Sequence, residues 1–323
     1  MNVLVVGYGS IGKRHVINLC RLNCIDKIII YTKVKEGLEI QSKKKIIFID
    51  AAIVVLPSVA SQYKIDFAII ANETYKHADT AIALAEKGCH LFIEKPISHN
   101  LEKIDLLKEI TQKKQIKVFV AYNLRYLPAI QYIKDQISKH IIGNLYFAKI
   151  EVGQYLPSWR PEVSYIDSYS ASAEYGGGVA LDLSHEVDYM RYLFGEPCLW
   201  KTMRSKASDL AISSEDIFEG IYKYKEGFVC NVHMDYLQRK AERKIRIVGS
   251  RGEIVCDFIE KWMEIKSPDG GMQVTEEKLF KMEDTYKNEL QEFIETITSN
   301  KPVAISIEDG IKAIELLEDS YDR

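Results

Sequence analysis

Val3-Leu4-Val5-Val6-Gly7-Tyr8-Gly9-Ser10-Ile11-Gly12-Lys13-Arg14-His15 is the stretch that decides the fold. Its four apolar residues predict a short buried strand, and the glycines that follow match the spacing G-x-G-x-x-G before a helix. In this setting Gly7 permits a sharp turn, Gly9 lets the backbone approach a pyrophosphate, and Gly12 lets the helix pack close to the strand. The N–H groups of the first helical turn, at Ser10 and Ile11, would then face phosphates.

The alternative is a turn that binds no ligand, because the chain has 18 glycines and chance matches to this spacing occur. The position of the match favours the dinucleotide, since an apolar strand precedes it and the helical spacing of Ile11, His15, Leu19 and Leu22 follows it. A dinucleotide site at the start of the chain is therefore the first prediction.

Length and composition indicate an ordinary soluble enzyme. The 323 residues predict about two domains. A net charge of −3 argues against a nucleic-acid partner or a membrane surface. No apolar run approaches the roughly 20 residues that span a bilayer, and the first strand begins too early for a signal peptide, so we expect a cytoplasmic protein. Of six scattered cysteines only Cys20 and Cys24 are close in sequence, so we expect no metal site.

Strands and helices alternate over the first 122 residues. This alternation predicts a doubly wound parallel sheet, a Rossmann-type dinucleotide-binding domain over residues 1–122, with its ligand at the carboxyl ends of the strands. Asn72, Glu94 and Tyr122 come directly after such ends. Apolar runs place the later strands near residues 28–31, 46–49, 67–71, 91–93 and 118–120.

The pattern changes over residues 123–323, which predict a second domain of the α+β class. Strands alternate with turns and have no crossover helices between them, which predicts antiparallel pairing. Two helices close the chain, one around Phe293 and the other from Glu308 to Tyr321. The strands are expected near residues 145–152, 200–206, 216–225, 228–236, 243–249 and 253–259.

The end of the second strand bears on the choice of coenzyme. Many NAD enzymes place an acidic residue there for the ribose hydroxyls, whereas this chain has Thr32 and Lys33. A hydroxyl and a cation suit the 2′-phosphate of NADP, so NAD(P) is expected with NADP weakly favoured. A solvated loop is the alternative, and Glu36 is close enough in sequence to oppose the preference.

Glu94-Lys95-Pro96 follows the strand near residues 91–93. A lysine at the carboxyl end of a strand, in the ligand crevice, can reach both cofactor and substrate. Burial and a nearby positive nicotinamide ring would lower its pKa toward the working range of an acid or base. The alternative is a surface lysine in front of a proline that starts a helix.

A second candidate stretch runs from Gly176-Gly177-Gly178 to Tyr189. A helix over this stretch, at 100° per residue, would bury a stripe that contains Leu183 and Val187. Its opposite face would present Asp182, His185, Asp188, Tyr189 and Tyr192. A carboxylate beside a histidine can set its tautomer and raise its basicity, and the glycines would let a flat ring approach the backbone. The alternative is a solvated helix face behind a flexible loop.

A third stretch is rich in aromatic residues. Aromatic faces pack against the C–H surfaces of sugars, and arginine binds carboxylates or phosphates. Core packing and an oligomer interface are the alternatives for such residues. The candidates for substrate binding are Tyr155, Trp159, Arg160 and Tyr169, with Arg125 entering the same region.

Together these motifs resemble the Gfo/Idh/MocA oxidoreductase family, the relatives of glucose–fructose oxidoreductase and inositol dehydrogenase. The glycine turn, the loop Asn72-Glu73-Thr74-Tyr75-Lys76-His77, Glu94-Lys95-Pro96 and the run 176–188 occur in the family's order over nearly the whole chain. The resemblance implies a second domain with a large open, mostly antiparallel sheet whose face forms a homodimer or homotetramer. It implies hydride transfer between NAD(P) and a secondary alcohol or ketone of a sugar, a sugar derivative such as a nucleotide sugar, or a cyclitol.

The resemblance also implies roles for individual residues. Lys95 and His185 would be catalytic and Asp182 would assist, and all three would contact the substrate, with Tyr122 nearby. The cofactor contacts beyond the glycine turn would come from Asn72, Thr74, His77, Glu94 and Lys95.

One departure concerns the spacing of the acid and the base. The family has three residues between this aspartate and histidine, and here there are two, Leu183 and Ser184. His185 keeps its distance to Asp188, so it is the safer assignment of the pair. The segments around Tyr155 and Tyr169 resemble a branch found among surface-sugar biosynthesis genes.

Two other functions occur among relatives of this family. One is an NAD-dependent glycoside hydrolase, which oxidises its sugar only transiently and releases an aglycone. The other is a regulator that senses a nucleotide without turnover, and it should have lost the lysine or the histidine. This chain keeps both Lys95 and His185.

Overall fold

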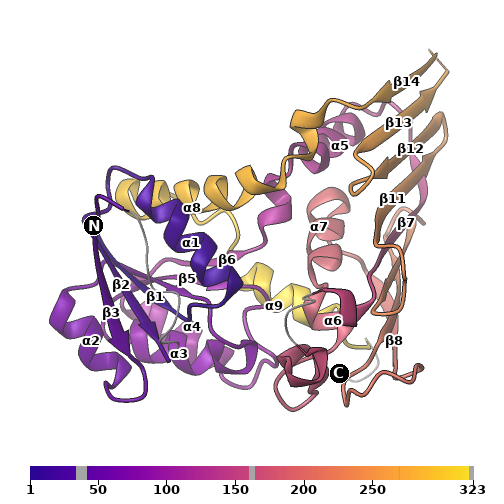
Figure 1. The fold of residues 1–323 in the computed structure, drawn as a ribbon. Coiled ribbons are helices and arrows are strands. Elements are labelled where there is room, and N and C mark those ends of the chain that lie inside the picture. The colour runs from indigo at the N-terminus through magenta and orange to yellow at the C-terminus, as the bar shows by residue number, and fades with distance from the viewer. Residues whose placement is uncertain (34–41, 160–163, 269, 320–323) are drawn as a thin grey trace. The chain divides into compact units, whose positions relative to one another are not determined.

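The computed structural model describes residues 1–33, 42–159, 164–268 and 270–319. The chain divides into two compact units, shown in Figure 1. The first unit consists of Met1–Tyr122 and Tyr286–Ile311, and the second of Asn123–Thr285 and Lys312–Arg323. In the part of the chain that is described, no helix is both long and apolar enough to cross a membrane.

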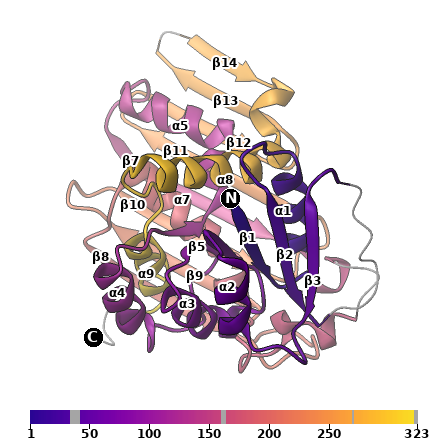
Figure 2. The ribbon, with the colours of Figure 1, turned by 90° about the vertical axis from the view of Figure 1, so that its left-hand side faces the viewer.

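The first unit is built on a six-stranded parallel sheet of order β3-β2-β1-β4-β5-β6, which confirms the doubly wound prediction. Helices α2, α3 and α4 lie on one side of the sheet, and α1 and α8 lie on the other (Figures 1 and 2). The strands are β1 (Asn2–Val6), β2 (Lys27–Thr32), β3 (Lys45–Asp50), β4 (Phe67–Ile70), β5 (His90–Glu94) and β6 (Val118–Ala121). The helices are α1 (Ser10–Cys20), α2 (Leu56–Tyr63), η1 (Thr74–Lys76), α3 (His77–Ala85), α4 (Ile104–Lys113), α8 (Met282–Ser299) and the start of α9 (Ile307–Glu315).

The central strands of this sheet are covered on both faces, which is why they are continuous apolar runs in the sequence. Every residue of β4 and of β6 is buried. Phe67, Phe92 and Phe119 from three strands meet Phe293 of α8, with ring centroids 5.4, 5.6 and 5.9 Å apart. Burial of each such side chain contributes about 1.5–3 kcal/mol. These rings hold α8, which comes late in the chain, against the sheet of the first unit.

The second unit is built on an eight-stranded sheet of order β14-β13-β12-β11-β7-β10-β9-β8. All neighbouring pairs are antiparallel except β7 with β10, which confirms a mostly antiparallel sheet. The strands are β7 (Leu145–Gly153), β8 (Leu199–Ser205), β9 (Ile217–Lys223), β10 (Val229–Asp235), β11 (Glu242–Gly249), β12 (Gly252–Asp257), β13 (Trp262–Ser267) and β14 (Gly270–Val274). The helices are η2 (Asn123–Tyr126), α5 (Pro128–Ser138), η3 (Leu156–Ser158), η4 (Tyr165–Asp167), η5 (Tyr169–Ala171), α6 (Val179–Asp182), α7 (His185–Phe194) and η6 (Glu277–Phe280).

Helices α5, α6 and α7 lie on one face of this sheet (Figure 1). Val187, Tyr189 and Met190 of α7 are fully buried in the core that this face forms. Along the strands buried residues alternate with residues of the other face, as in the burial pattern of β9, where Phe218 and Tyr222 point inward. This alternation is the period of a sheet with one covered face.

The structure corrects two expectations for helices in the second unit. The single helix expected through Asp182 and His185 is broken into α6 and α7, because Leu183 has φ −105° and ψ 24° and leaves the helical conformation. Asp188 and Tyr189, which were placed on the polar face of that helix, are buried in α7, and this opposes the alternative of a solvated helix face. The helix expected from Glu308 to Tyr321 ends earlier, with α9 spanning Ile307–Glu315.

Candidate active site

The glycine turn between β1 and α1 has the geometry that phosphate binding requires. Gly7 has a φ of +96°, and a Cβ there would collide with the backbone of Ala71. A Cβ at Gly12 would collide with the carbonyl oxygen of Gly7, so the close packing of helix on strand needs this glycine. A Cβ at Gly9 would meet no protein atom within 4 Å, so no protein neighbour explains the glycine there.

The start of α1 is also suited to an anion. Gly9 is its N-cap, and no side chain caps the first turn. The first N–H groups of an uncapped helix point toward solvent and carry a partial positive charge. Ser10 is exposed and Ile11 half-buried, so both belong to the surface that phosphates would contact. The residues present therefore fit a dinucleotide.

A group of charges lies beside this turn, where β2 ends. Thr32 is buried and Lys33 is exposed. Burial would raise the pKa of Glu73, but a hydrogen bond from Lys76 (2.8 Å) and the charges of Lys76 and Lys33 lower it below its ordinary value. The positive charge of Lys33 therefore favours the ionised form of Glu73, which lies in the loop that begins with Asn72. Glu36 lies outside the described residues.

His77 joins two of the predicted segments. Its Nδ1 lies 2.9 Å from the carbonyl oxygen of Pro96, and its Nε2 lies 3.0 Å from that of Asn72. The side-chain amide of Asn72 donates to Thr80 (3.0 Å), and Thr74 is buried at the start of η1. Burial lowers the pKa of His77. His77 was predicted to contact the cofactor. In the structure both of its ring nitrogens face backbone carbonyl oxygens, and the imidazole thereby links the loop at Asn72 to the loop at Pro96.

Glu94 is the last residue of β5, and Lys95 and Pro96 follow it at the carboxyl edge of the sheet. Lys95 is half-buried, and the residues on either side of it are buried. Both oxygens of the Glu94 carboxylate have partners within the protein. Oε1 lies 2.5 Å from Nε2 of His15, and Oε2 accepts a hydrogen bond from the backbone N–H of Lys95 (3.3 Å). His15 is a functional candidate that the sequence pattern missed, because it occupied an apolar position of the predicted helix.

In the second unit, His185 opens α7 directly after the break at Leu183. Among residues 181–190, all of which are described, His185 alone is not buried. The preceding acid, Asp182, is 6% exposed and accepts a hydrogen bond from the hydroxyl of Tyr236 (2.6 Å). Tyr236 follows β10, more than fifty residues away, so no local pattern indicated it. The break thus leaves a partly accessible imidazole close in sequence to a carboxylate that is held by a buried phenol.

The glycines before α6 are explained by protein neighbours. A Cβ at Gly177 would collide with backbone carbonyls of Tyr169 and Ser170, and one at Gly178, where φ is +116°, would collide with the carboxylate of Glu215. Glu215 also accepts the backbone N–H of Ala180 (3.2 Å). These protein contacts are by themselves sufficient reason for Gly177 and Gly178, whereas the expected approach of a flat ring stays a prediction.

Arg125 has a carboxylate partner inside the second unit. Its Nε and one terminal nitrogen lie 2.9 and 2.6 Å from the two oxygens of Asp188, which is 1% exposed. Paired N–H···O bonds of this kind fix both groups in one geometry. The ion pair ties η2 to α7, and the Tyr192 ring lies beside the guanidinium, 5.7 Å from its centre.

The predicted aromatic residues lie in different surroundings. Trp159 packs edge-on against Tyr236, with centroids 5.2 Å apart, and donates to the carbonyl oxygen of Gln154 (3.2 Å). The guanidinium of Arg239 lies 3.6 Å above the Tyr155 ring. Tyr169 is half-buried at the start of η5, and Tyr122 is fully buried. Arg160 lies outside the described residues. Through Tyr236, the aromatic stretch is connected to Asp182.

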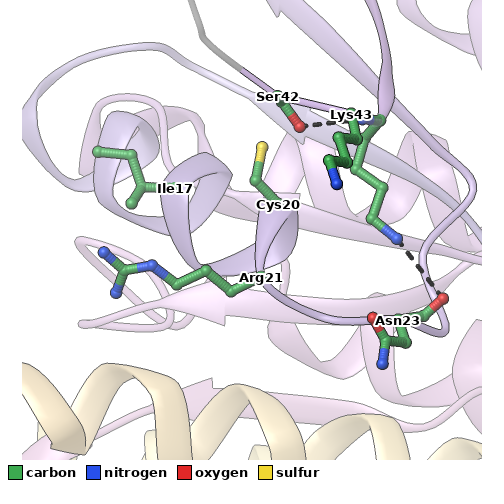
Figure 3. A pocket seen from close by; sticks show the side chains of 7 residues that line it. Ile17, Cys20, Arg21, Asn23, Ser42 and Lys43 are labelled. Carbon is green, nitrogen blue, oxygen red and sulfur yellow. Dashed lines mark hydrogen bonds between the residues drawn. The ribbon is translucent and has the colours of Figure 1, made fainter.

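A surface pocket on the first unit holds none of the predicted site residues. It lies beside the end of α1, with Cys20, Arg21 and Lys43 among its lining side chains (Figure 3). Lys44 from the same wall donates to the carbonyl oxygen of Ile25 (2.7 Å). We assign the pocket no role.

Comparison with known proteins identifies the family. Residues 1–122 match the model described as the oxidoreductase family, NAD-binding Rossmann fold, and residues 134–322 match the oxidoreductase family, C-terminal alpha/beta domain. The chain belongs to the Gfo/Idh/MocA family. As a member of the Gfo/Idh/MocA family, it is an oxidoreductase with an NAD-binding domain.

Two curated Gfo/Idh/MocA relatives are inositol enzymes. The chain is 26% identical to the myo-inositol 2-dehydrogenase of Thermotoga maritima over 331 residues, covering 97% of this chain and 93% of that protein. It is 24% identical to the inositol 2-dehydrogenase of Rhizobium meliloti over 278 residues, covering 81% and 79%. Among solved structures, the WlbA dehydrogenase of Bordetella pertussis, in complex with NADH and UDP-GlcNAcA, has the same fold, with a TM-score of 0.84 at 18% identity over 98% of this chain and 93% of that one.

Proposed function

We propose that this protein is an NAD(P)-dependent dehydrogenase or reductase that acts on a secondary alcohol, or the corresponding ketone, of a sugar, a sugar derivative or a cyclitol. The observation that carries the proposal is the family match over both domains. The geometry of the glycine turn, which is open at Gly9, supports a bound dinucleotide. The names of the relatives, inositol dehydrogenases and a dehydrogenase bound to a nucleotide sugar, support the substrate class.

In this proposal the chain's own residues move the proton and hold the substrate. His185 takes the proton of the substrate hydroxyl during oxidation, and Asp182 orients or charges it. Lys95 holds the reacting oxygen and stabilises the charge that develops on it. The bound nicotinamide supplies the hydride acceptor. The partial exposure of His185 among buried neighbours and the fixed carboxylate of Asp182 support these roles.

The remaining predicted residues bind the two ligands. We propose that the first domain, residues 1–122, binds the dinucleotide through the glycine turn and the loops after β2, β4 and β5. The second domain, residues 123–323, would contact the sugar through the aromatic residues, and Tyr155 and Trp159 are half-buried and retain surface for this. The full set proposed for the substrate is Lys95, Tyr122, Arg125, Tyr155, Trp159, Arg160, Tyr169, Asp182 and His185.

A survey of substrates tests the proposed reaction. Purified protein is incubated with NAD or NADP and a panel of cyclitols, free sugars and nucleotide sugars, and the absorbance of the reduced cofactor is followed. A net increase with one substrate class is expected. Release of an aglycone without net absorbance change would identify the glycoside hydrolase alternative. Cofactor binding without turnover on any class would favour the sensor.

The coenzyme preference yields a separate prediction. Lys33→Ala is expected to weaken NADP(H) binding more than NAD(H) binding, because only the former carries a 2′-phosphate for the cation to neutralise. The loss should be on the order of twofold to fivefold, the scale of an exposed ion pair. Titration calorimetry with both coenzymes measures it.

Lys45→Ala is the matched control for Lys33→Ala. Lys45 is also an exposed lysine of this sheet, but it stands at the start of β3, at the opposite edge from the carboxyl ends. Equal losses for NADP(H) and NAD(H) in Lys33→Ala, or a strong preference of the unmodified protein for NAD(H), would contradict the assignment.

We further propose that the open face of the second unit's sheet forms the homodimer or homotetramer contact. Large apolar side chains on this face are exposed on three strands: Phe147 (46%), Met203 (58%) and Ile221 (54%). The strand register places them on the same face, opposite the buried Tyr222. Clustered exposed apolar residues of this kind mark protein interfaces. Sedimentation equilibrium of the purified protein measures the mass.

A further inference from the structure

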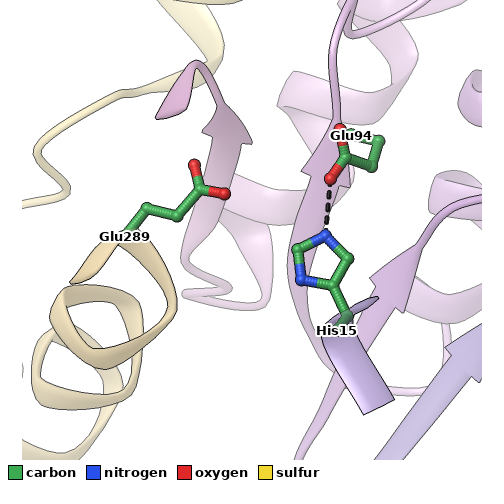
Figure 4. A group of neighbouring side chains, drawn as sticks. All are labelled: His15, Glu94 and Glu289. Carbon is green, nitrogen blue, oxygen red and sulfur yellow. Dashed lines mark hydrogen bonds and ion pairs between the residues drawn. The ribbon is translucent and has the colours of Figure 1, made fainter. Parts of the chain in front are cut away.

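Three ionisable side chains meet inside the first unit. His15 comes from α1, Glu94 from the end of β5 and Glu289 from α8 (Figure 4). One ligand atom of each lies within 4.8 Å of the others. His15 and Glu289 are 0% exposed and Glu94 is 8% exposed. Such a group must balance its charge internally, because an uncompensated charge in the interior is costly.

A proton on one carboxyl removes one of the two negative charges that the group could carry. Two buried carboxylates at this separation cannot both ionise unless a cation compensates them. Glu94 has donors for both of its oxygens, whereas neither oxygen of Glu289 has a hydrogen-bond partner among the described residues. Burial, and then the charge of Glu94, raise the pKa of Glu289 well above its ordinary value. The extra proton is therefore on Glu289.

A bound divalent metal is the other way to balance the charges, and the geometry opposes it. The Nε2 of His15 and Oε1 of Glu94 are 2.5 Å apart, the length of a short charge-assisted hydrogen bond. Two ligands of one tetrahedral zinc ion would lie about 3.3 Å apart, given metal–ligand distances near 2.0 Å. The hydrogen-bond distance between His15 and Glu94 is therefore too short for both atoms to bind one zinc ion.

The group is connected to Lys95 through the backbone. The second oxygen of Glu94 accepts the Lys95 N–H, and Nδ1 of His77 lies 2.9 Å from the carbonyl oxygen of Pro96 on the other side. We propose that His15 is a positioning residue for Lys95, acting through the Glu94 carboxylate, and that Glu289 completes the group as a neutral carboxylic acid. The inference rests on the proposed function, because it assumes that Lys95 acts on the substrate.

Turnover tests the positioning role of His15. His15→Ala is expected to lower kcat on the order of tenfold, the scale for losing a group that orients a ligand-binding residue. The KM for the coenzyme should change less than kcat, because the glycine turn that would bind the phosphates is intact and only the loop after β5 is affected. His15→Gln, which keeps an N–H donor for Glu94, should recover part of the lost kcat. Val16→Ala is the matched control, because Val16 is also fully buried on α1 and has no polar contact.

Lys95→Ala separates failure of this inference from failure of the proposed function. If Lys95→Ala turns over normally, the proposed role of Lys95 is wrong. If Lys95→Ala is inactive while His15→Ala keeps full kcat, or loses no more than Val16→Ala at equal thermal stability, only the positioning role is wrong. Loss of kcat in His15→Ala that His15→Gln does not restore at all would also count against it.

The protonation of Glu289 is tested by stability against pH. His15 on α1 and Glu94 on β5 face Glu289, and Arg14 on α1 lies 4.4 Å from the ring of Tyr286 on α8. The folded protein keeps a proton on Glu289 that the unfolded chain releases above its ordinary pKa, so this group makes stability fall as pH rises. Glu289→Gln is an uncharged isostere and removes this dependence. We therefore compare the thermal midpoints of Glu289→Gln and the unmodified protein. As the pH rises from about 5 to about 8, the difference between the two midpoints should shift in favour of Glu289→Gln.

Glu94→Gln provides the opposite result within the same group. Its amide has only one acceptor oxygen for two donors, so it should lower the midpoint throughout this pH range. A Glu289→Gln variant that is destabilised equally at every pH would show that Glu289 is ionised. One equivalent of zinc that resists a chelator in the purified protein, and that is absent from Glu289→Gln, would contradict the neutral acid. It would show that the three side chains bind a metal ion.

Discussion

Replacing His185 with asparagine is expected to lower kcat by roughly 100-fold or more while leaving coenzyme affinity nearly unchanged. This is the usual scale for the loss of a general base. The loss should appear equally in kcat and kcat/KM, because the proton transfer matters mainly in the transition state. Coenzyme affinity should persist, since the glycine turn belongs to the other unit of the chain.

Steady-state kinetics on the substrate found in the survey, with titration calorimetry for the coenzyme, measures this result. His140→Asn is the matched control, because it makes the same change at an exposed site in the second unit, where φ is +52° and asparagine is well tolerated. Near-normal turnover of His185→Asn would overturn the proposed mechanism. It would leave Lys95 or a tyrosine as the candidate base.

Asp182→Asn is expected to cost less than His185→Asn, because a group that only orients the base is not itself required for the chemistry. The contacts of Asp182 in the structure support this expectation. The Asp182 carboxylate accepts the Tyr236 hydroxyl, and the chain breaks between α6 and α7 before His185. An asparagine can keep the bond from Tyr236 through its carbonyl oxygen. A loss as large as that of His185→Asn would instead make Asp182 an equal partner in the proton transfer.

The first unit was the more predictable part of the fold. Its strands are buried on both faces, so they are continuous apolar runs that stand out from amphipathic helices. The sheet of the second unit alternates buried and exposed residues, which predicted β7–β12 closely. The strand β14 was missed because Gly270 and Met272 on this edge strand are exposed and carry no apolar pattern. The strand β13 was also missed, although its Met263 and Ile265 are buried in alternation. The parallel pairing of β7 with β10 depends on long-range contacts that no local pattern shows.

The candidate site was predictable where chemistry follows local sequence. The glycine turn is one contiguous motif, and Lys95 follows directly on a recognisable strand. The helical wheel failed at Leu183, because a wheel assumes a continuous helix and cannot detect a break. Tyr236 and Glu289 are distant in sequence from Asp182 and Glu94, respectively, so only the folded chain brings each pair together.

Gly9→Val is expected to abolish coenzyme binding while the protein still folds. The backbone at Gly9 has φ −74° and ψ −166°, an extended conformation that valine adopts readily. A Cβ there meets no protein atom within 4 Å, so the fold has room for the larger side chain. The same space is where a pyrophosphate would approach the N-terminus of α1. The Cβ of the new side chain would therefore occupy space that the ligand needs and that the protein leaves open.

Calorimetry with NAD(H) and NADP(H), together with thermal unfolding, separates the two effects. Gly271→Val is the matched control, because a Cβ there is also unobstructed, its nearest neighbour being the carbonyl oxygen of Ile265 at 3.9 Å. Gly12→Val provides the contrast, since its side chain would collide with the Gly7 carbonyl and should destabilise the first unit itself. A folded Gly9→Val protein that binds either coenzyme tightly would show that the pyrophosphate lies elsewhere, and it would remove the glycine turn from the proposed site.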